Sequence, residues 1–359
     1  MTQAPGTCPS QAESPPAQRV RVVTGSRLHM GMFSFGRTDV RQFGGLGFMV
    51  DRPAIRLELA LASNKSEHRA SLAESPTDPQ LSSDDPILQR ALHTARRYLQ
   101  AECLESQLGR IQLRLVDAPP QHAGLGLGTQ LSLAVAQGLQ WLFNLPRKPL
   151  DCLARTVGRG KRSAVGIHGF EQGGLLVEAG KLHDQEISPL IARLPLPDRW
   201  RFVLLTPPET PGLAGQAEIA AFAQLPPPPP ALTDQLCRLA LLEILPAVQT
   251  ANVQRFGQAV DQFGQLAGQC FAPQQQGIYA TPRVARLAQA SRSAGACGVA
   301  QSSWGPTLVA VTSGQDHAQQ LIENLQSAGA WDDVSMIVAA PRNRGASIDQ
   351  IDVEEPGAV

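Results

Sequence analysis

The sequence predicts an α+β protein of two domains, and three observations support this fold class. The chain has 359 residues, of which 43% are hydrophobic, enough to fill two ordinary cores. Segments with an apolar residue at every second position alternate with segments whose apolar residues recur at helical spacing. Two prolines in LPLPDRW (194–200) interrupt this periodicity, so we place the domain boundary near residue 195.

The first domain is expected to span residues 19–195. Residues 1–18 are rich in Pro, Gln, Ser and Ala and are predicted to form a loose tail. SSDDPILQRALHTARRYLQ (82–100) begins with capping residues and continues as one apolar helical stripe. Alternation predicts strands at RVRVVTG (19–25), AIRLELALA (54–62) and GRIQLRLVDAP (109–119).

The second domain is expected to span residues 196–345, followed by a tail at 346–359. A stiff polyproline connector, LPPPPPAL (225–232), precedes several helices rich in Ala, Leu and Gln. A further helix is predicted from about 315 to 329. Apolar strands are predicted at RFVLLTPP (201–208), TLVAVT (307–312) and VSMIVAAP (334–341).

Composition excludes several classes of function. Lys plus Arg and Asp plus Glu both number 31, so the chain lacks the overall basic charge of a nucleic-acid-binding protein. The six cysteines show neither a CxxC pair nor metal-ligand spacing, which favours free thiols in a reducing cytoplasm. No apolar run reaches membrane-spanning length and no secretory signal is evident, so we expect a cytoplasmic protein that does not contact membranes.

The segment HAGLGLGTQ (122–130) is a candidate phosphate-binding turn. Gly124, Gly126 and Gly128 follow a predicted strand and open a predicted helix, whose free N–H groups can face an anion. The pattern is neither GxGxxG nor a Walker loop, and by itself it is equally compatible with a tight turn that binds nothing.

HAGLGLGTQ resembles the glycine-rich loop of the GHMP kinase superfamily. That superfamily implies a first domain like domain 2 of ribosomal protein S5 and a ferredoxin-like second domain. The resemblance extends through SRLHMGMFSFG (26–36), FGGLGFMVDRP (43–53), GRGKRSAVGIHGFEQGGLLVEAG (158–180), FAPQQQGIYATP (271–282) and GVAQSSWGPTLVA (298–310).

Two departures argue against kinase chemistry. Thr129 and Gln130 replace the paired serines of the kinases, and the region with the kinase aspartate carries Gly166 and His168 without an aspartate. In these features the chain resembles the β-ribofuranosylaminobenzene 5'-phosphate synthase family of tetrahydromethanopterin biosynthesis. A GHMP-type ATP-dependent small-molecule kinase and a non-catalytic ligand-binding protein on the same fold are the alternatives.

The resemblance implies a decarboxylating phosphoribosyltransferase. Such an enzyme joins 5-phosphoribosyl diphosphate to 4-hydroxybenzoate or 4-aminobenzoate and yields a C-riboside 5'-phosphate, diphosphate and CO2. It also implies Mg²⁺ as cofactor and small molecules as partners, with a homodimer as a possible assembly. The reaction needs no enzyme nucleophile, and no nucleophile motif such as GxSxG is present.

Candidate site residues follow from these motifs. The phosphate-binding candidates are the glycine loop with Thr129 and Gln130, and the basic cluster Arg159, Lys161 and Arg162. The substrate-binding candidates are Arg27, His122, Ser303 and Trp304, and the catalytic candidates are His29, His168 and Glu171.

Each of these roles has a structural alternative. The basic cluster can be a solvated loop, His29 a core histidine, and Trp304 an anchor for its turn. Asp51 competes with Glu171 as the acidic residue for metal binding or proton transfer, and the metal ligands stay open.

Overall fold

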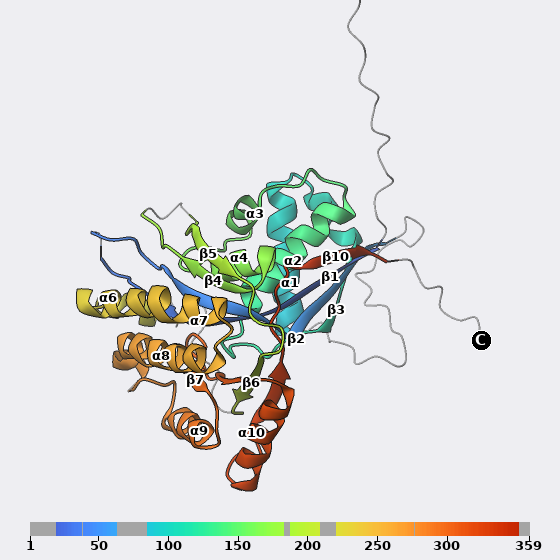
Figure 1. The fold of residues 1–359 in the computed structure, drawn as a ribbon. Helices are drawn as coiled ribbons and strands as arrows, with labels where there is room; N and C mark the ends of the chain where they lie inside the picture. Colours follow the sequence, from blue (N-terminus) through green and yellow to red (C-terminus); the bar gives the residue numbers. More distant parts are fainter. Residues whose placement is uncertain are drawn as a thin grey trace, which may run out of the picture.

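The computed structural model describes residues 19–37, 39–62, 85–182, 187–208, 220–275 and 277–351, in which the chain forms two antiparallel sheets (Figure 1). The first has the order β10-β1-β2-β4-β5, with β3 also paired to β2. Its strands are β1 (Arg19–Met32), β2 (Gly45–Leu61), β3 (Ile111–Asp117), β4 (Leu175–Glu178), β5 (Leu190–Leu194) and β10 (Ser347–Gln350). The second has the order β7-β8-β6-β9 and consists of β6 (Arg201–Thr206), β7 (Gly298–Gln301), β8 (Leu308–Thr312) and β9 (Ser335–Ala339).

Helices cover one face of the first sheet because its strands alternate apolar side chains toward them. Val20, Val22, Leu57 and Leu59 are fully buried in one cluster with residues of the covering helices. The first of these helices starts where predicted, since Asp85 caps it by accepting the N–H of Ile87 at 2.6 Å. The covering elements are α1 (Pro86–Ala101), the 3-10 turn Glu105–Arg110, α2 (Leu127–Leu142), α3 (Leu150–Thr156) and α4 (Val165–Gln172).

The second sheet has the strand order of a ferredoxin-like domain, and its helices lie on both faces. On one face are α9 (Pro282–Ser293) and α10 (Gln315–Ser327). The other face packs on α6 (Pro230–Leu239), the π-helical segment Ala240–Ile244, α7 (Leu245–Gln249) and α8 (Val253–Gln275).

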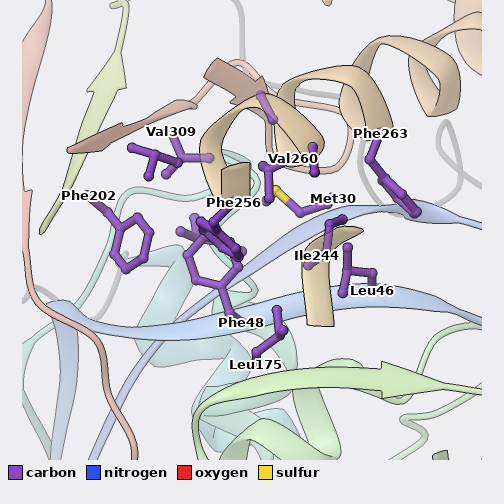
Figure 2. Close-up of a cluster of buried hydrophobic side chains, with 14 of the residues drawn as sticks. Met30, Leu46, Phe48, Leu175, Phe202, Ile244, Phe256, Val260, Phe263 and Val309 are labelled. Atoms are coloured by element: carbon purple, nitrogen blue, oxygen red, sulfur yellow. The ribbon is translucent and has the colours of Figure 1, made fainter. Parts of the chain in front are cut away.

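One hydrophobic core joins the two sheets through α8 (Figure 2). Phe256 of α8 packs against Phe48 of the first sheet and Phe202 of the second, with ring centroids 6.1 and 6.4 Å apart. The domains are therefore held together by a shared apolar layer, which places β1 and the β7–β8 turn next to each other.

Most expected elements are confirmed, and one boundary is corrected. The chain passes from the first sheet to the second between Leu194 and Arg201, in the segment that contains the two prolines. Residues 347–350 of the predicted tail instead form β10, which pairs with Val20–Val23 of β1. A four-residue strand carries too short a pattern to be recognised before its pairing edge is known. The predicted tail at 1–18 and residues 352–359 lie outside the described residues.

Candidate active site

Three motifs far apart in the sequence meet at the start of α2. The N–H of Arg27 donates to the carbonyl of Leu125 at 3.0 Å, so the glycine loop runs beside β1. Gly124 and Gly126 have φ angles of +81° and +74°, and Gly126 precedes the first residue of α2. A Cβ on Gly126 would lie 2.9 Å from the Cβ of Arg27. Glycine is thus required by both backbone conformation and close approach.

The β7–β8 turn of the second domain holds the glycine loop and β1 together. The hydroxyl of Ser302 donates to the carbonyl of Gly124 at 2.7 Å and accepts the N–H of His29 at 3.1 Å. The N–H of Ser303, a residue with φ +57°, donates to the carbonyl of His29 at 2.8 Å. The sequence placed Ser303 at the site, whereas Ser302 supplies the side-chain contacts.

Arginine side chains surround Gly128 in the first turn of α2. A Cβ on Gly128 would lie 3.0 Å from Nη1 of Arg90 and 3.3 Å from Nη1 of Arg159. Nε and Nη2 of Arg159 donate to the hydroxyl of Ser132 at 3.1 and 3.0 Å. Burial, with the nearby charges of Arg90 and Arg97, lowers the pKa of Arg159 to about 10.

This arginine cluster has the charge of an anion site. Across the described ranges, Arg90, Arg97 and Arg159 form no ion pair with an acidic side chain. The crowding of Arg90 and Arg159 at the amino end of a 16-residue helix is unfavourable unless an anion lies there. Arg159 was expected from the sequence, whereas Arg90 and Arg97 were missed because α1 belongs to none of the motifs.

Arg27 and His29 lie on the helix-covered face of the first sheet. Burial lowers the pKa of His29 well below its usual value, and the charges of Arg27 and Arg162 act in the same direction. Nε2 of this imidazole is buried and lacks a hydrogen-bond partner among the described residues. His29 is therefore a neutral histidine with an unused ring nitrogen beside the converging motifs.

Glu178 at the end of β4 is an acidic residue that the sequence analysis did not select. It is fully buried, and its Oε2 accepts the N–H of Ala164 at 2.7 Å. Burial raises the pKa of Glu178 to about 7, although Ser163, Ala164, Ser188 and Arg27 act in the opposite direction. A signal was present in GGLLVEAG, where one acid interrupts an apolar strand.

An aromatic cluster lies next to the basic segment that precedes α4. Trp304 is 7% exposed and packs on Phe271 at a centroid distance of 4.7 Å. The guanidinium of Arg162 lies 4.9 Å from the ring centroid of Phe222. Trp304 therefore packs within the same cluster that Arg162 contacts. The cluster comprises Phe35, Phe43, Phe222, Phe271 and Trp304.

The side chain of Gln130 does not face the phosphate site, which corrects the sequence assignment. It is fully buried, where its Oε1 accepts the hydroxyl of Thr24 at 2.7 Å and its Nε2 donates to the carbonyl of Gly166 at 2.6 Å. Gln130 therefore joins α2 to β1 and α4. Thr129 is half-buried next to Gly166, and a Cβ at Gly166 would lie 3.2 Å from its methyl group.

Both acidic candidates from the sequence lie away from this site. Glu171 is exposed at the carboxyl end of α4, where it lines a surface cavity with Trp141 of the carboxyl half of α2. Oδ1 of Asp51 accepts the N–H of Ala340 at 2.7 Å and so links β2 to the segment after β9. The position of Glu171 therefore contradicts its predicted catalytic role, because Glu171 lies at the carboxyl end of α4 and the glycine loop lies near the amino end.

The remaining predicted residues surround the site less closely. Nε2 of His168 donates to the carbonyl of Ser188 at 2.8 Å, so its ring is tied to the segment before β5. His122 is half-buried with φ +58°, and Lys161 is exposed.

Within the described residues no cluster of three His, Cys, Asp or Glu side chains can hold a metal ion. None of the described helices is long and apolar enough to span a membrane.

Comparisons with known proteins agree with this architecture. Residues 244–330 match the family model of the GHMP kinase C-terminal region. The chain is 26% identical over 336 residues to the β-ribofuranosylphenol 5'-phosphate synthase of Methanothermobacter thermautotrophicus, covering 90% of this chain and 96% of the relative. It is 28% identical over 345 residues to the protein of the same name from Archaeoglobus fulgidus, covering 92% of this chain and 99% of the relative.

The chain is therefore similar to these synthases over most of its length. A third synthase of that name, from Methanocaldococcus jannaschii, is 29% identical over 68% of this chain and 76% of its own length. The predicted family and the prediction of a glycosyltransferase-type enzyme are thereby confirmed.

Solved structures confirm the fold predicted for this chain. Homoserine kinase from Cytophaga hutchinsonii superposes with a TM-score of 0.62 at 16% identity, covering 95% of this chain and 100% of the kinase. Mevalonate pyrophosphate decarboxylase from Streptococcus pyogenes gives a TM-score of 0.60 at 11% identity, covering 92% and 99%. The chain therefore has the GHMP kinase fold.

Proposed function

We propose that this protein joins 5-phosphoribosyl diphosphate to 4-hydroxybenzoate and releases diphosphate and CO2. The observation that carries the proposal is the arginine cluster at the start of α2, whose Arg159 lies three residues before Arg162, the arginine that contacts the aromatic cluster. A substrate pair with phosphates on one partner and a benzoate ring on the other matches both features. The relatives are named for a phenol product, which favours 4-hydroxybenzoate over 4-aminobenzoate.

The glycine loop is assigned to the diphosphate. N–H groups at the start of α2 and the guanidinium groups of Arg90 and Arg159 supply hydrogen bonds and positive charge there. Arg27, beside Gly126, faces the same loop from β1. These groups stabilise the charge that develops on diphosphate as its bond to the ribose breaks.

The aromatic acid is assigned to the neighbourhood of Trp304 and Arg162. Arginine binds a carboxylate in a bidentate manner, and the aromatic rings pack against the benzoate ring. The ring carbon that bears the carboxylate bonds to the anomeric carbon, and loss of CO2 then restores aromaticity. A para hydroxyl group stabilises the intermediate, so benzoate itself is expected to bind without reacting.

Mg²⁺ is proposed as the counter-ion that accompanies the diphosphate. The lack of a metal-ligand cluster in the described ranges fits an ion held mainly by substrate phosphates and water, the usual arrangement for magnesium. When bound, the ion supplies additional positive charge to the leaving group. A cytoplasmic location, a homodimer and a place in tetrahydromethanopterin biosynthesis stay predictions of the sequence.

Release of labelled CO2 from carboxyl-labelled 4-hydroxybenzoate tests the proposal. We expect release that depends on 5-phosphoribosyl diphosphate with Mg²⁺ and that Gly126→Val abolishes, because a β-branched side chain cannot adopt φ +74° there. The same assay with 4-aminobenzoate measures the choice of aromatic acid.

Calorimetric titration separates the alternatives. Clear preference for ATP over 5-phosphoribosyl diphosphate, with phosphorylation of a small alcohol, would identify a kinase. Tight binding of 5-phosphoribosyl diphosphate and 4-hydroxybenzoate without turnover would identify a binding protein.

A further inference from the structure

The proposed reaction needs a proton acceptor that the motifs did not reveal. As the ring attacks the ribose, the para hydroxyl becomes strongly acidic, and its proton must leave and later return. Glu171 and Asp51 lie elsewhere. Glu171 lines the surface cavity beside α2, and Asp51 accepts the N–H of Ala340. Glu178 is the buried carboxyl group on the face that carries Arg27 and His29, and the inference below rests on the proposed function.

Gly45 of β2 provides the opening between His29 and Glu178. Gly45 is directly opposite Glu178 in the β2–β4 pairing, so their side-chain positions share one face of the sheet. A Cβ on Gly45 would lie 3.4 Å from Nε2 of His29. The imidazole therefore extends over the glycine toward the strand that bears Glu178.

Two buried polar atoms at this position have unused hydrogen-bonding capacity. Oε1 of Glu178 and Nε2 of His29 lack partners within the part of the chain that the structure describes. A buried polar atom without a partner is unfavourable, so two such atoms on one face indicate that hydroxyl groups reach them when substrate is bound.

Ser163 connects the buried carboxyl group to the half-exposed segment that contains Arg159 and Arg162. Its hydroxyl lies close enough to Glu178 to lower the pKa of that carboxyl group, and it accepts the N–H of Val165 at 3.2 Å. A hydroxyl has one proton to donate and two lone pairs. Ser163 can therefore donate to Glu178 while its second lone pair accepts a proton from a ligand.

We propose that Glu178, acting through the hydroxyl of Ser163, takes up the proton of the para hydroxyl group of the aromatic substrate and returns it after decarboxylation. A substrate carboxylate would be repelled at this position, whereas a hydroxyl donates to it. His29, neutral and with Nε2 unused, completes the hydrogen bonding around the same oxygen.

The proton and electron balance closes without another reactant. The ring carbon forms its bond to the anomeric carbon as the C–O bond to diphosphate breaks, and diphosphate leaves with that electron pair. The substrate O–H proton passes to Ser163 while the Ser163 proton passes to Glu178, leaving a cyclohexadienone. The bond to the carboxylate then breaks, CO2 leaves, and the electron pair restores a phenolate, which regains its proton by the reverse path.

The electrostatic environment suits this exchange. Burial raises the pKa of Glu178 to about 7, which brings the group close to a working neutral pH, where a proton acceptor is most effective. The charged and titratable groups on this face or packed against it include Arg27 and His29 of β1, Arg162 before α4, His168 of α4 and the buried Lys181 after β4. Activity should therefore rise with pH through about 7 as Glu178 loses its proton.

The first test compares Glu178→Gln, Ser163→Ala and the matched control Ser188→Ala. Ser188 also acts on the Glu178 carboxyl group, but it is fully buried and its hydroxyl accepts the N–H of Gly180 at 2.7 Å. We expect kcat to fall about a hundredfold in the first two variants and to stay within about threefold in the control. Glu178→Gln should also lose the rise of kcat with pH, while all three bind 5-phosphoribosyl diphosphate like the wild type by calorimetry.

The second test uses 3-fluoro-4-hydroxybenzoate, whose hydroxyl loses its proton more readily. With this substrate the deficit of Glu178→Gln relative to wild type should shrink at least about tenfold. Three results would each show that Glu178 only holds α4 in place. They are an unchanged deficit of Glu178→Gln with the fluorinated substrate, a pH dependence of kcat retained in that variant, and equal losses of kcat in Ser163→Ala and Ser188→Ala. Weaker binding of 5-phosphoribosyl diphosphate would assign Glu178 to the ribose hydroxyls. If the proposed function itself is wrong, the wild-type protein will release no CO2, a result distinct from the outcomes above.

Discussion

Two glutamates in the first sheet expose little surface but differ in how deeply their carboxyl groups are buried and in their partners. Glu58 of β2 accepts hydrogen bonds from Arg19 at 2.6 Å and from Arg21 at 2.7 and 2.9 Å, with Arg114 3.6 Å away. Glu178 of β4 is held mainly by a backbone N–H and nearby hydroxyls, and one of its oxygens has no partner in the described ranges.

The two carboxyl groups consequently shift in opposite directions. Burial raises the pKa of Glu58, but hydrogen bonds from Arg21 and Arg19 outweigh it, and the pKa falls below its usual value. For Glu178 burial prevails and the pKa rises to about 7. The comparison teaches that a fully paired buried acid supports the fold, whereas an incompletely paired one is available for chemistry.

The largest expected effect is the pH dependence of stability at Glu178. Its folded pKa lies above the ordinary 4.5, so folding loses free energy as pH rises from about 4.5 to about 7. Such a shift corresponds to about 3 kcal/mol. Urea unfolding at pH 5 and pH 8 should show Glu178→Gln gaining stability relative to wild type at the higher pH. Parallel pH profiles would contradict the assignment of an unpaired buried acid.

The next effect concerns Arg159, which lies beside the start of α2. Arg159→Ala removes a charge-assisted contact worth about 1.5–3 kcal/mol, so affinity for 5-phosphoribosyl diphosphate should fall about ten- to hundredfold. Stability should not fall, because repulsion from Arg90 and Arg97 is relieved. Calorimetry is the measurement, and Arg155→Ala, an exposed arginine paired with Asp151, is the control. Wild-type affinity in Arg159→Ala would remove the arginine cluster from the phosphate site.

A smaller effect on stability, with the opposite dependence on pH, is expected at Glu58. Glu58→Gln leaves activity unchanged and lowers the free energy of unfolding by about 1–2 kcal/mol at pH 7, since its arginine partners are partly exposed. The folded pKa is depressed, so this advantage of the wild type is present above about pH 4.5 and disappears as pH falls through the folded pKa. Thermal unfolding across this range measures it, and a deficit that persists in acid would argue against the ion pairs as its cause.

The smallest expected effect is at Glu171. Because Glu171 is exposed at the far end of α4, Glu171→Ala should leave kcat and KM within about twofold of wild type. Steady-state kinetics with both substrates checks this. A large loss of kcat would restore the role that the sequence motif suggested and would weaken the case for Glu178.

The sequence by itself determined the elements whose signals are local. Alternating and helical periodicities placed the strands and helices, and the two prolines near residue 195 marked the passage between sheets. The glycines at 124 and 126 could be selected from the sequence because the residue type itself signals the constraint. Their positive φ angles and the close approach of neighbouring atoms leave no room for a side chain. The family resemblance came from the same ordered motifs.

Only the tertiary structure decided which polar side chains face the site. Arg90 and Glu178 belong to an ordinary helix and an apolar strand, and they matter because packing brings α1 to Gly128 and β4 beside Gly45. Gln130 and Glu171 lie inside matching motifs yet face the core and the far end of α4. The direction of a side chain depends on the rotation of its helix and the register of its strand, and these are fixed by contacts between residues distant in sequence.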